Sequence, residues 1–436
     1  MDSPATQIKN RRATFLTLLV VSLCWLSILA EGYDLTVYGA VLHELLRDPE
    51  WALTPVMAGA IGSYVLVGML IGNVIVGSLT DLIGRKNTLI ASVTLFSVSM
   101  GLAAMAPSPE MFGLFRFIGG LGIGGVVPTA TALTLEYSPP ERRSLLNAIM
   151  FTGYPLGGVV GALLALHFLP EYGWRMMFWI GVLPLLLIPV MVKWLPESII
   201  FLHSRKRFQE AEQVAKRFGF SVASFTSFEE KQEGPLESKW HSIRQLFHKS
   251  NIRATLLFWS AMFMGLLMIY GLNTWLPKLM QKAGYPLGSS LTFLLTLNLA
   301  AAFGVLIIGA ASDHWGSKRV ITGSFLLGGI SISLLSVKSS LPVVYTLVAL
   351  AGFGAISSSL ILAPYITKYF PPDTRATALG FALGFARLGA VIGPIMGGLL
   401  LAWQVSQSWN FYFFAVPGIF AALAIALIPK NQSRQI

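Results

Sequence analysis

The sequence contains twelve long, predominantly apolar stretches, and this feature restricts the possible folds more than any other. A helix needs about 20 apolar residues to cross a bilayer. Because the hydrocarbon layer holds no water to satisfy exposed backbone groups, stretches of this length must become helices. We therefore predict twelve transmembrane helices, at about 14–42, 54–79, 88–107, 111–135, 145–169, 175–194, 253–276, 290–311, 319–337, 341–367, 376–402 and 409–428.

The overall composition agrees with an all-α integral membrane protein. Hydrophobic residues make up 54% of the 436 residues and charged residues only 12%, whereas soluble domains are about 25% charged. There is too little charge to coat a soluble fold of this length, which argues against a soluble enzyme. The single cysteine, Cys24, cannot form an internal disulfide.

Lysine and arginine are unequally distributed between the two sides that twelve spans define. Of 31 such residues, 24 lie at the termini or in loops on the same side as the termini. Cytoplasmic loops carry the excess of Lys and Arg, so both termini are predicted to be cytoplasmic. The positive charge then matches anionic lipid rather than nucleic acid. Five residues lie on the opposite side: Arg47, Arg175, Lys278, Lys282 and Lys338.

The two halves of the sequence repeat each other at a constant offset of 232 residues. One register holds across five separate segments, which is difficult to obtain by chance. Examples of the matched pairs are Gly77 with Gly309, Asp81 with Asp313, Gly84 with Gly316, Tyr137 with Tyr369, and Arg143 with Arg375.

The longest polar stretch lies between the sixth and seventh spans. We predict an N-terminal six-helix half at 1–194, a cytoplasmic linker at 195–251 and a C-terminal six-helix half at 252–436. Two pseudo-symmetric halves of this kind place a solute site near the membrane midplane, and one half rocks on the other during transport.

The loop between the second and third spans carries a recognisable motif. It runs from Gly77 through Asp81 and Gly84 to Arg85 and Lys86, and it resembles the signature of the major facilitator superfamily. The resemblance extends over the whole chain through the span count, linker and repeat. The loop is interpreted as a conformational gate, with a simple topology anchor as the alternative.

Further charged residues extend this interpretation. Asp313 belongs to the weaker copy of the motif in the second half. Glu136 and Arg143 flank the cytoplasmic end of the fourth span and suggest a second charged latch.

Only four charged residues lie well inside the spans, and two of them are the acids Glu31 and Asp34. A charge at the bilayer centre costs at least about 2.5–3.5 kcal/mol, so such residues are functional candidates. Glu31 and Asp34 are separated by three residues and share one helix face. Two neighbouring carboxylates do not both ionise easily, which suits proton coupling. The alternative is that one of them is a structural partner of Arg116.

The other two intramembrane charges are Arg116 and Arg387. Arginine stays charged, so Arg116 needs a carboxylate. It could form a coupling ion pair, contact substrate, or extend toward the outer interface. Arg387 has Pro155 as its repeat counterpart, so the charge belongs to one half only. A guanidinium binds a carboxylate through two parallel hydrogen bonds, which favours Arg387 as a substrate-anion site. The alternative is a pair with Asp34.

Three polar or aromatic residues near these charges could also contact substrate. Tyr38 continues the face of Glu31 and Asp34, and Tyr270 and Asn273 interrupt the otherwise apolar seventh span. For aromatic residues near span ends, an interfacial position is the common alternative.

Several function classes find no support in the sequence. There is no GxxxxGK[ST] nucleotide-binding loop, no metal-ligand spacing and no nucleophile–base set on a span. An enzyme, a cofactor and a metal are therefore not expected. The cytoplasmic segments are too short for a signalling domain.

A motif in the first span indicates a particular branch of this superfamily. Its run Glu31-Gly32-Tyr33-Asp34 resembles the Asp-Gly-X-Asp motif of the aromatic acid:proton symporters, with Glu31 in place of the first Asp. The resemblance implies a monomer in the bacterial inner membrane that takes up a small aromatic acid together with protons. A proton-coupled exporter of drugs or metabolites is the alternative.

Overall fold

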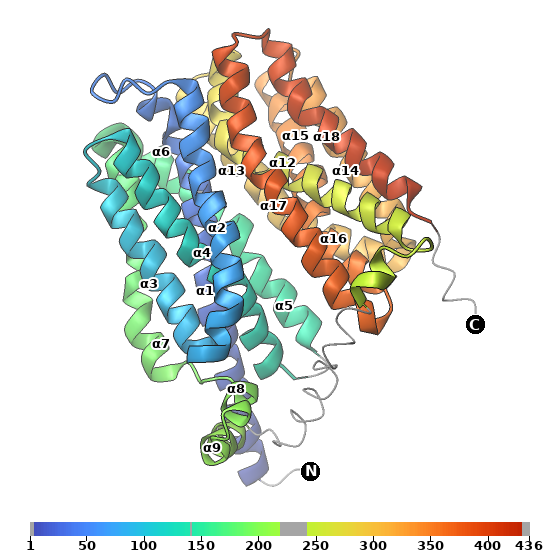
Figure 1. Cartoon of the computed structure of the whole chain (residues 1–436). Coiled ribbons are helices and arrows are strands. Elements are labelled where there is room, and N and C mark those ends of the chain that lie inside the picture. The colour runs from blue at the N-terminus through green and yellow to red at the C-terminus, as the bar shows by residue number, and fades with distance from the viewer. Residues whose placement is uncertain (1–3, 140–141, 219–241, 430–436) are drawn as a thin grey trace. The chain divides into compact units, whose positions relative to one another are not determined.

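The computed structural model describes residues 4–139, 142–218 and 242–429, and every element within these ranges is helical. The main helices follow one another along the chain and are labelled in Figure 1. Their bounds are α1 Pro4–Leu45, α2 Pro55–Ile83, α3 Arg85–Ala104, α4 Pro109–Tyr137, α5 Arg143–Phe151, α6 Gly153–Ile180, α12 Ile252–Lys282, α13 Leu287–Trp315, α14 Ser317–Leu334, α15 Leu341–Ala351, α16 Ser357–Tyr369, α17 Pro372–Ala402 and α18 Gln407–Leu427. The remaining elements are η2 Leu183–Leu187, α7 Ile188–Trp194, α8 Ile199–Ser204, α9 Phe208–Phe218 and η3 Gly352–Ile356.

The prediction of a multi-span helical membrane protein is confirmed. Among the described residues, ten helical segments are long and apolar enough to cross a membrane. The remaining two predicted stretches are shorter in the structure. Helix α14 covers residues 319–334 of the stretch 319–337, and the end of α6 with η2 and α7 covers 175–194. The latter begins after Gly173, whose φ of 70° interrupts α6.

The repeat is visible in the backbone as well as in the sequence. Gly84 separates α2 from α3 with a φ of 89°, and its counterpart Gly316 separates α13 from α14 with a φ of 88°. Such left-handed values favour glycine, because a side chain would clash with the backbone. The same turn is therefore built twice, 232 residues apart.

The described chain packs into two compact units. Unit 1 comprises Met1–Asp34, Val67–Gly157 and Phe178–Pro235, and unit 2 comprises Leu35–Leu66, Gly158–Met177 and Leu236–Ile436. Unit 2 combines segments from both sequence repeats, because residues 35–66 and 158–177 pack with the described chain from residue 242 onward. In unit 1, α1 and α6 approach closely at Gly32: a Cβ there would lie 2.1 Å from the carbonyl oxygen of Tyr154.

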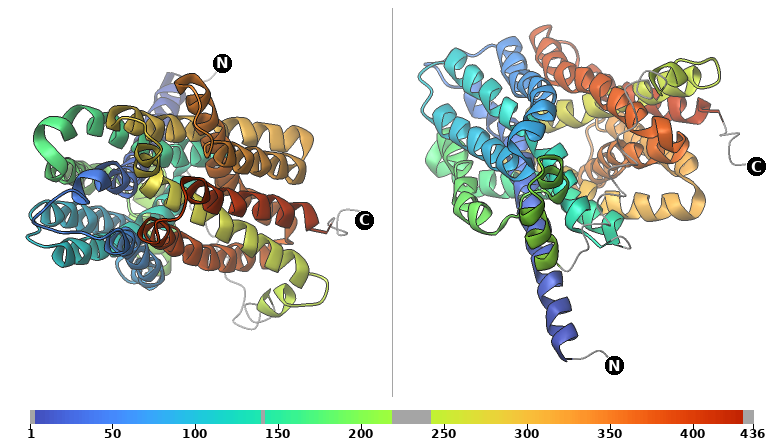
Figure 2. Two further views of the ribbon diagram at one scale, coloured as in Figure 1. Left: turned by 90° about the horizontal axis from the view of Figure 1, so that it is seen from above. Right: turned by 60° about the horizontal axis from the view of Figure 1, so that its bottom comes forward.

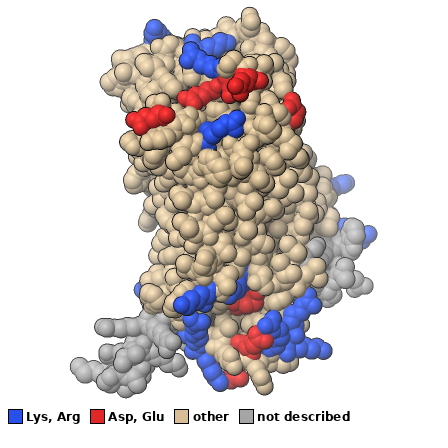
Figure 3. Space-filling model, turned by 90° about the vertical axis from the view of Figure 1, so that its left-hand side faces the viewer, with Lys and Arg blue, Asp and Glu red and all other residues tan. Residues whose placement is uncertain are grey.

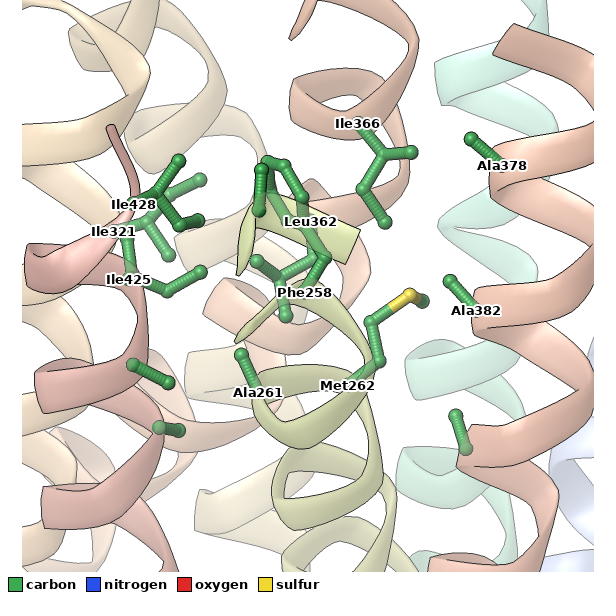
Figure 4. Close-up of a cluster of buried hydrophobic side chains, with 14 of the residues drawn as sticks. Phe258, Ala261, Met262, Ile321, Leu362, Ile366, Ala378, Ala382, Ile425 and Ile428 are labelled. Carbon is green, nitrogen blue, oxygen red and sulfur yellow. The ribbon is translucent and has the colours of Figure 1, made fainter. Parts of the chain in front are cut away.

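Unit 2 is held together by helix pairs with an apolar core. Helix α12 packs along α17 and α14 along α18 (Figure 2). Between them lies a cluster of buried side chains that includes Phe258, Met262, Leu362, Ile366 and Ile425 (Figure 4).

The surface matches a protein that spans a bilayer. On the face shown in Figure 3, the charged side chains gather toward the two ends, and a broad band between them is uncharged. Large apolar side chains such as Val74, Leu186 and Phe303 are exposed, which is expected where lipid rather than water covers the protein.

Candidate functional site

An ion pair between Asp34 of α1 and Arg116 of α4 lies inside unit 1. The Arg116 Nη1 atom donates to Asp34 Oδ1 and also approaches the Asp34 carbonyl oxygen at 3.3 Å. Both residues are almost fully buried, with exposed fractions of 2% and 3%. Arg116 also lies 5.8 Å from the centre of the Phe178 ring. The structure therefore pairs Arg116 with a carboxylate of the first span. Its side chain is buried in unit 1 and does not extend to the protein surface.

Glu31 lies one turn before Asp34 on α1 and is only 1% exposed. The two acids flank Gly32, where α1 is in close contact with the backbone of α6 at Tyr154. A second contact follows at Gly157, where a Cβ would lie 2.1 Å from the Leu29 carbonyl oxygen. These contacts fix both carboxylates within a tightly packed part of unit 1.

A second buried charge in unit 1 is Glu136 at the end of α4. Arg85 Nη1 donates to its carboxylate at 2.6 Å, as does the Ser198 hydroxyl at 2.8 Å. The backbone N–H of Ile200 donates to the other oxygen at 3.1 Å. The carboxylate of Glu136 thereby ties the motif loop to the start of α8.

Neighbouring residues strengthen that connection. Glu197 accepts from the backbone N–H groups of Lys86 and Ser198, at 3.0 and 2.8 Å. Arg143 donates to the Ser138 carbonyl oxygen at 3.3 Å. Sequence reasoning missed Glu197 and Ser198, although an acid directly after the sixth span was a usable signal.

The remaining predicted gate residues lie outside the buried cluster around Glu136. Gly77 lies within α2, and Asp81 is exposed, with its carbonyl oxygen accepting from Arg205 at 2.6 Å. In unit 2, Asp313 pairs with Lys368 at 2.6 Å. Both side chains of that pair are more than half exposed.

Arg387 of α17 and Tyr270 of α12 meet in unit 2. Arg387 Nη1 donates to the Tyr270 hydroxyl at 3.3 Å. Arg387 is half-buried and Tyr270 is buried. A guanidinium carries five N–H donors in a planar fork. The pair therefore places a fixed cation and a phenol hydroxyl next to each other.

Asn273, one turn after Tyr270, is held by a residue that sequence reasoning missed. Asn298 of α13 donates to Asn273 Oδ1 at 2.9 Å, and Asn273 donates to the Ile269 carbonyl oxygen at 2.9 Å. Both asparagines are buried. Their mutual hydrogen bond makes Asn273 a positioning residue in this conformation. The signal was available, because Asn298 interrupts an apolar span.

Tyr38 lies in unit 2 with its ring buried. Its hydroxyl donates to the Ala58 carbonyl oxygen at 2.6 Å, which joins α1 to α2. The ring also packs against Gly62. This contact is a structural use of the residue that the sequence alone did not indicate.

Within the described ranges, no group of three or more His, Cys, Asp or Glu residues could hold a metal ion. The site chemistry is that of charges and hydrogen bonds: a buried acid–arginine pair in unit 1 and an arginine–phenol pair in unit 2.

Comparison with known proteins identifies relatives over almost the whole chain. The family model described as Major Facilitator Superfamily matches residues 24–304 and 291–435. The chain is 36% identical to the benzoate transport protein of Acinetobacter baylyi, covering 95% of this chain and 90% of that protein. It is also 36% identical to the gentisate transporter of Corynebacterium glutamicum, covering 98% and 91%.

The fold is also similar to solved structures. The inward open conformation of the xylose transporter XylE from E. coli superimposes with a TM-score of 0.76 at 17% identity. The match covers 96% of this chain and 98% of that one.

Proposed function

Because the chain belongs to the major facilitator superfamily and is a multi-pass membrane transporter rather than an enzyme, we propose that it imports an aromatic carboxylic acid together with protons. The relatives named for benzoate and gentisate support the substrate class. The proposed location is the bacterial inner membrane, with cytoplasmic termini and a monomeric chain. The excess of Lys and Arg on the side of the termini supports this orientation.

The observation that carries the substrate proposal is the Arg387–Tyr270 pair. Arginine can hold a carboxylate in a two-point fork, and it cannot lose its charge. A tyrosine hydroxyl can donate to a carboxylate or accept from a ring hydroxyl. Together, these groups match the polar ends of benzoate and its hydroxylated derivatives.

The proposed proton carrier is Asp34, with Glu31 beside it. While Asp34 is ionised, it neutralises Arg116 in a buried pair. A proton on Asp34 removes that pairing and leaves Arg116 as an uncompensated charge, which is costly in a buried site. Protonation therefore changes which arrangement of α1 and α4 is favourable, and this supports a role in coupling.

The proposed transport cycle combines the two sites. An outward-facing state binds the acid at Arg387 and a proton on Asp34 or Glu31, the halves rock, and both ligands leave on the cytoplasmic side. Two ion pairs at the helix ends would break or form during the rocking. They are Arg85 with Glu136, and Asp313 with Lys368. One monoanion moving with one proton transfers no net charge.

The test is uptake of labelled benzoate, 4-hydroxybenzoate and protocatechuate into proteoliposomes under an inward proton gradient. We expect uptake by the parent protein and its loss in Asp34→Asn, which cannot exchange a proton. Counterflow of labelled acid without a gradient should survive in Asp34→Asn, because substrate binding remains. Lys338→Met, on an exposed outer residue, is the matched control.

Two results would overturn parts of the proposal. No uptake of any aromatic acid by folded, correctly oriented protein would reject the substrate class. Efflux driven by the same gradient would instead favour the exporter alternative.

A further inference from the structure

The ends of α1 and α12 meet in unit 2 and bring two cations and a histidine together. A Cβ on Gly39 would lie 1.9 Å from the Asn273 carbonyl oxygen, so the backbones of the two helices touch there. One turn further along α1, His43 Nδ1 lies 3.2 Å from Lys278 Nζ of α12. Arg47 follows one turn later and adds to the positive potential at both His43 and Lys278. We call these three residues the outer basic cluster.

Lys278 carries a charge in this cluster, whereas His43 is a neutral acceptor. A lysine ammonium has three N–H donors and no acceptor, so His43 Nδ1 must supply the lone pair of their hydrogen bond. A proton on Nδ1 would remove that lone pair, and the neighbouring charges of Lys278 and Arg47 oppose such a proton. His43 therefore holds one donor of the ammonium and leaves two.

The nearby acids on α1 and in the loop after it are engaged elsewhere. The carboxylate of Glu44 accepts from the backbone N–H of Trp174 on α6. Asp48 accepts from a backbone N–H two residues later in the chain, at 3.0 Å. Among the side chains that the structure describes, no carboxylate forms an ion pair with Lys278 or Arg47. The positive charge of the cluster is therefore not compensated within the described chain.

The surroundings of the cluster favour an anion as its missing partner. Lys278 is half-buried and Arg47 is exposed, and a partly buried charge is costly unless it is paired. A further cation, Arg175 of α6, lies over the rings of Trp51 and Trp174, at 5.7 and 4.5 Å from their centres. The cluster also lies at the membrane side opposite the predicted cytoplasmic termini, where an imported solute arrives.

We infer that the outer basic cluster captures the carboxylate of the incoming organic acid before the acid reaches Arg387. Lys278 is its anchor, and Arg47 attracts the anion from the outer medium. Charges of one sign lining a partly buried site raise the local concentration and the association rate of an oppositely charged solute. The inference rests on the proposed function and orientation, and it assigns the cluster to the rate of entry.

The first test measures the local potential without transport. In a Cys24→Ala background, Leu46→Cys places a thiol in the turn after α1, next to Arg47. An anionic and a cationic methanethiosulfonate of similar size, both membrane-impermeant, are applied to intact cells. The ratio of their rates is divided by the ratio for a free thiol. We expect a normalised anionic-to-cationic ratio of about ten or more, because a surface potential of several kT acts oppositely on the two reagents.

Two single variants and one rescue test the source of this potential. Lys278→Met and Arg47→Met should each lower the ratio about threefold or more, whereas Lys278→Arg keeps the charge and should retain the ratio. Lys338→Met removes an exposed cation elsewhere and is the control. An unchanged ratio in both Lys278→Met and Arg47→Met would overturn the inference. Failure of both reagents to reach position 46 would overturn it as well, because an entry site must be reachable from outside.

The second test asks whether the cluster binds the acid itself. Benzoate should slow the reaction of Leu46→Cys with the anionic reagent. Benzyl alcohol, which has the ring but no carboxylate, should not. Equal protection by inorganic phosphate at the same ionic strength would overturn the assignment to the organic acid, as would the absence of protection by benzoate.

The third test measures uptake of labelled benzoate. Far below the KM, Arg47→Met should lower the initial rate about 3- to 10-fold with the Vmax retained, and added salt should diminish the difference from the parent. Uptake by the parent that Arg47→Met leaves unchanged would overturn the entry role while the proposed function stands. Protection by benzoate without any uptake by the parent would reject the proposed function and the entry role, and would leave only an anion site.

Discussion

The two packing units treat their intramembrane and loop charges in opposite ways. In unit 1, Arg116 is buried against Asp34, and Arg85 is paired with a Glu136 side chain that is 1% exposed. In unit 2, Arg387 contacts the neutral hydroxyl of Tyr270.

The loop pairs show the same contrast in one repeat register. Lys368 occupies the position 232 residues after Glu136, and it pairs with Asp313 of the repeated motif. The sign at the helix end is thus reversed, and the unit 2 pair is largely exposed. The two repeats share their backbone turns, but their charged side chains differ in how far water reaches them. This difference agrees with the proposal that unit 1 carries the proton and unit 2 binds the anion.

The largest expected effect comes from breaking the buried pair in unit 1. Arg116→Met should lower the free energy of unfolding by about 3–5 kcal/mol, because it leaves the Asp34 carboxylate buried without its guanidinium. Thermal unfolding in detergent measures this effect. Adding Asp34→Leu should restore much of the stability, since replacing a whole buried ion pair is often neutral.

The double variant also separates folding from coupling. It should fold but fail to couple uptake to a proton gradient, because the proposed carrier of the proton is gone. If Arg116→Met is as stable as the parent, the buried pair does not hold α1 to α4, and the contrast between the units weakens.

Replacing Arg387 of unit 2 should weaken substrate binding and leave the stability of the protein nearly unchanged. Arg387→Met is expected to raise the KM for benzoate about 10- to 100-fold, which corresponds to losing a charge-assisted hydrogen bond of about 1.5–3 kcal/mol. The unfolding temperature should change little. Arg387→Lys keeps the charge without the fork and should give an intermediate KM.

The control for this prediction is Lys338→Met, which removes an exposed cation elsewhere and should leave the KM unchanged. An unchanged KM in Arg387→Met would contradict the substrate role of Arg387. A large loss of stability would show that Arg387 is structural, as Arg116 is.

A smaller effect is expected at the paired amides of unit 2. Asn298→Leu should reduce stability by about 1–3 kcal/mol, since it leaves the buried Oδ1 of Asn273 without a donor. The combination Asn273→Leu/Asn298→Leu should recover most of that loss. If the double variant also keeps its benzoate KM, Asn273 does not contact substrate; a raised KM would return it to the binding site.

The sequence was sufficient for the architecture because long apolar stretches have one solution in a bilayer. The twelve stretches, the repeated loop and the four intramembrane charges were all readable. The shared turn at Gly84 and Gly316 follows directly from the offset. The pairing of Asp34 with Arg116 was among the predicted alternatives, because arginine needs a carboxylate there.

The side-chain partners were less predictable for a physical reason. In a membrane helix, both the lipid-facing and the buried face are apolar, so periodicity does not show which face is packed. The hydrogen bonds of Asn298, Tyr38 and His43 depend on that packing. The unit boundaries likewise depend on contacts between distant helices, which no local pattern encodes.

The smallest expected effect is at the exposed pair of Asp313 and Lys368 in unit 2. It can be compared directly with the buried pair of Arg85 and Glu136 in unit 1. Asp313→Asn should change the free energy of unfolding by less than about 1 kcal/mol, because exposed ion pairs contribute little. Glu136→Gln, its buried counterpart in unit 1, should cost more, since Arg85 loses its carboxylate in a site that water reaches poorly. Thermal unfolding of the two variants at low and high salt measures the difference, and salt should diminish only the effect of Asp313→Asn. Equal costs for both variants would mean that burial does not distinguish the two loops, and that their different charge signs reflect topology alone.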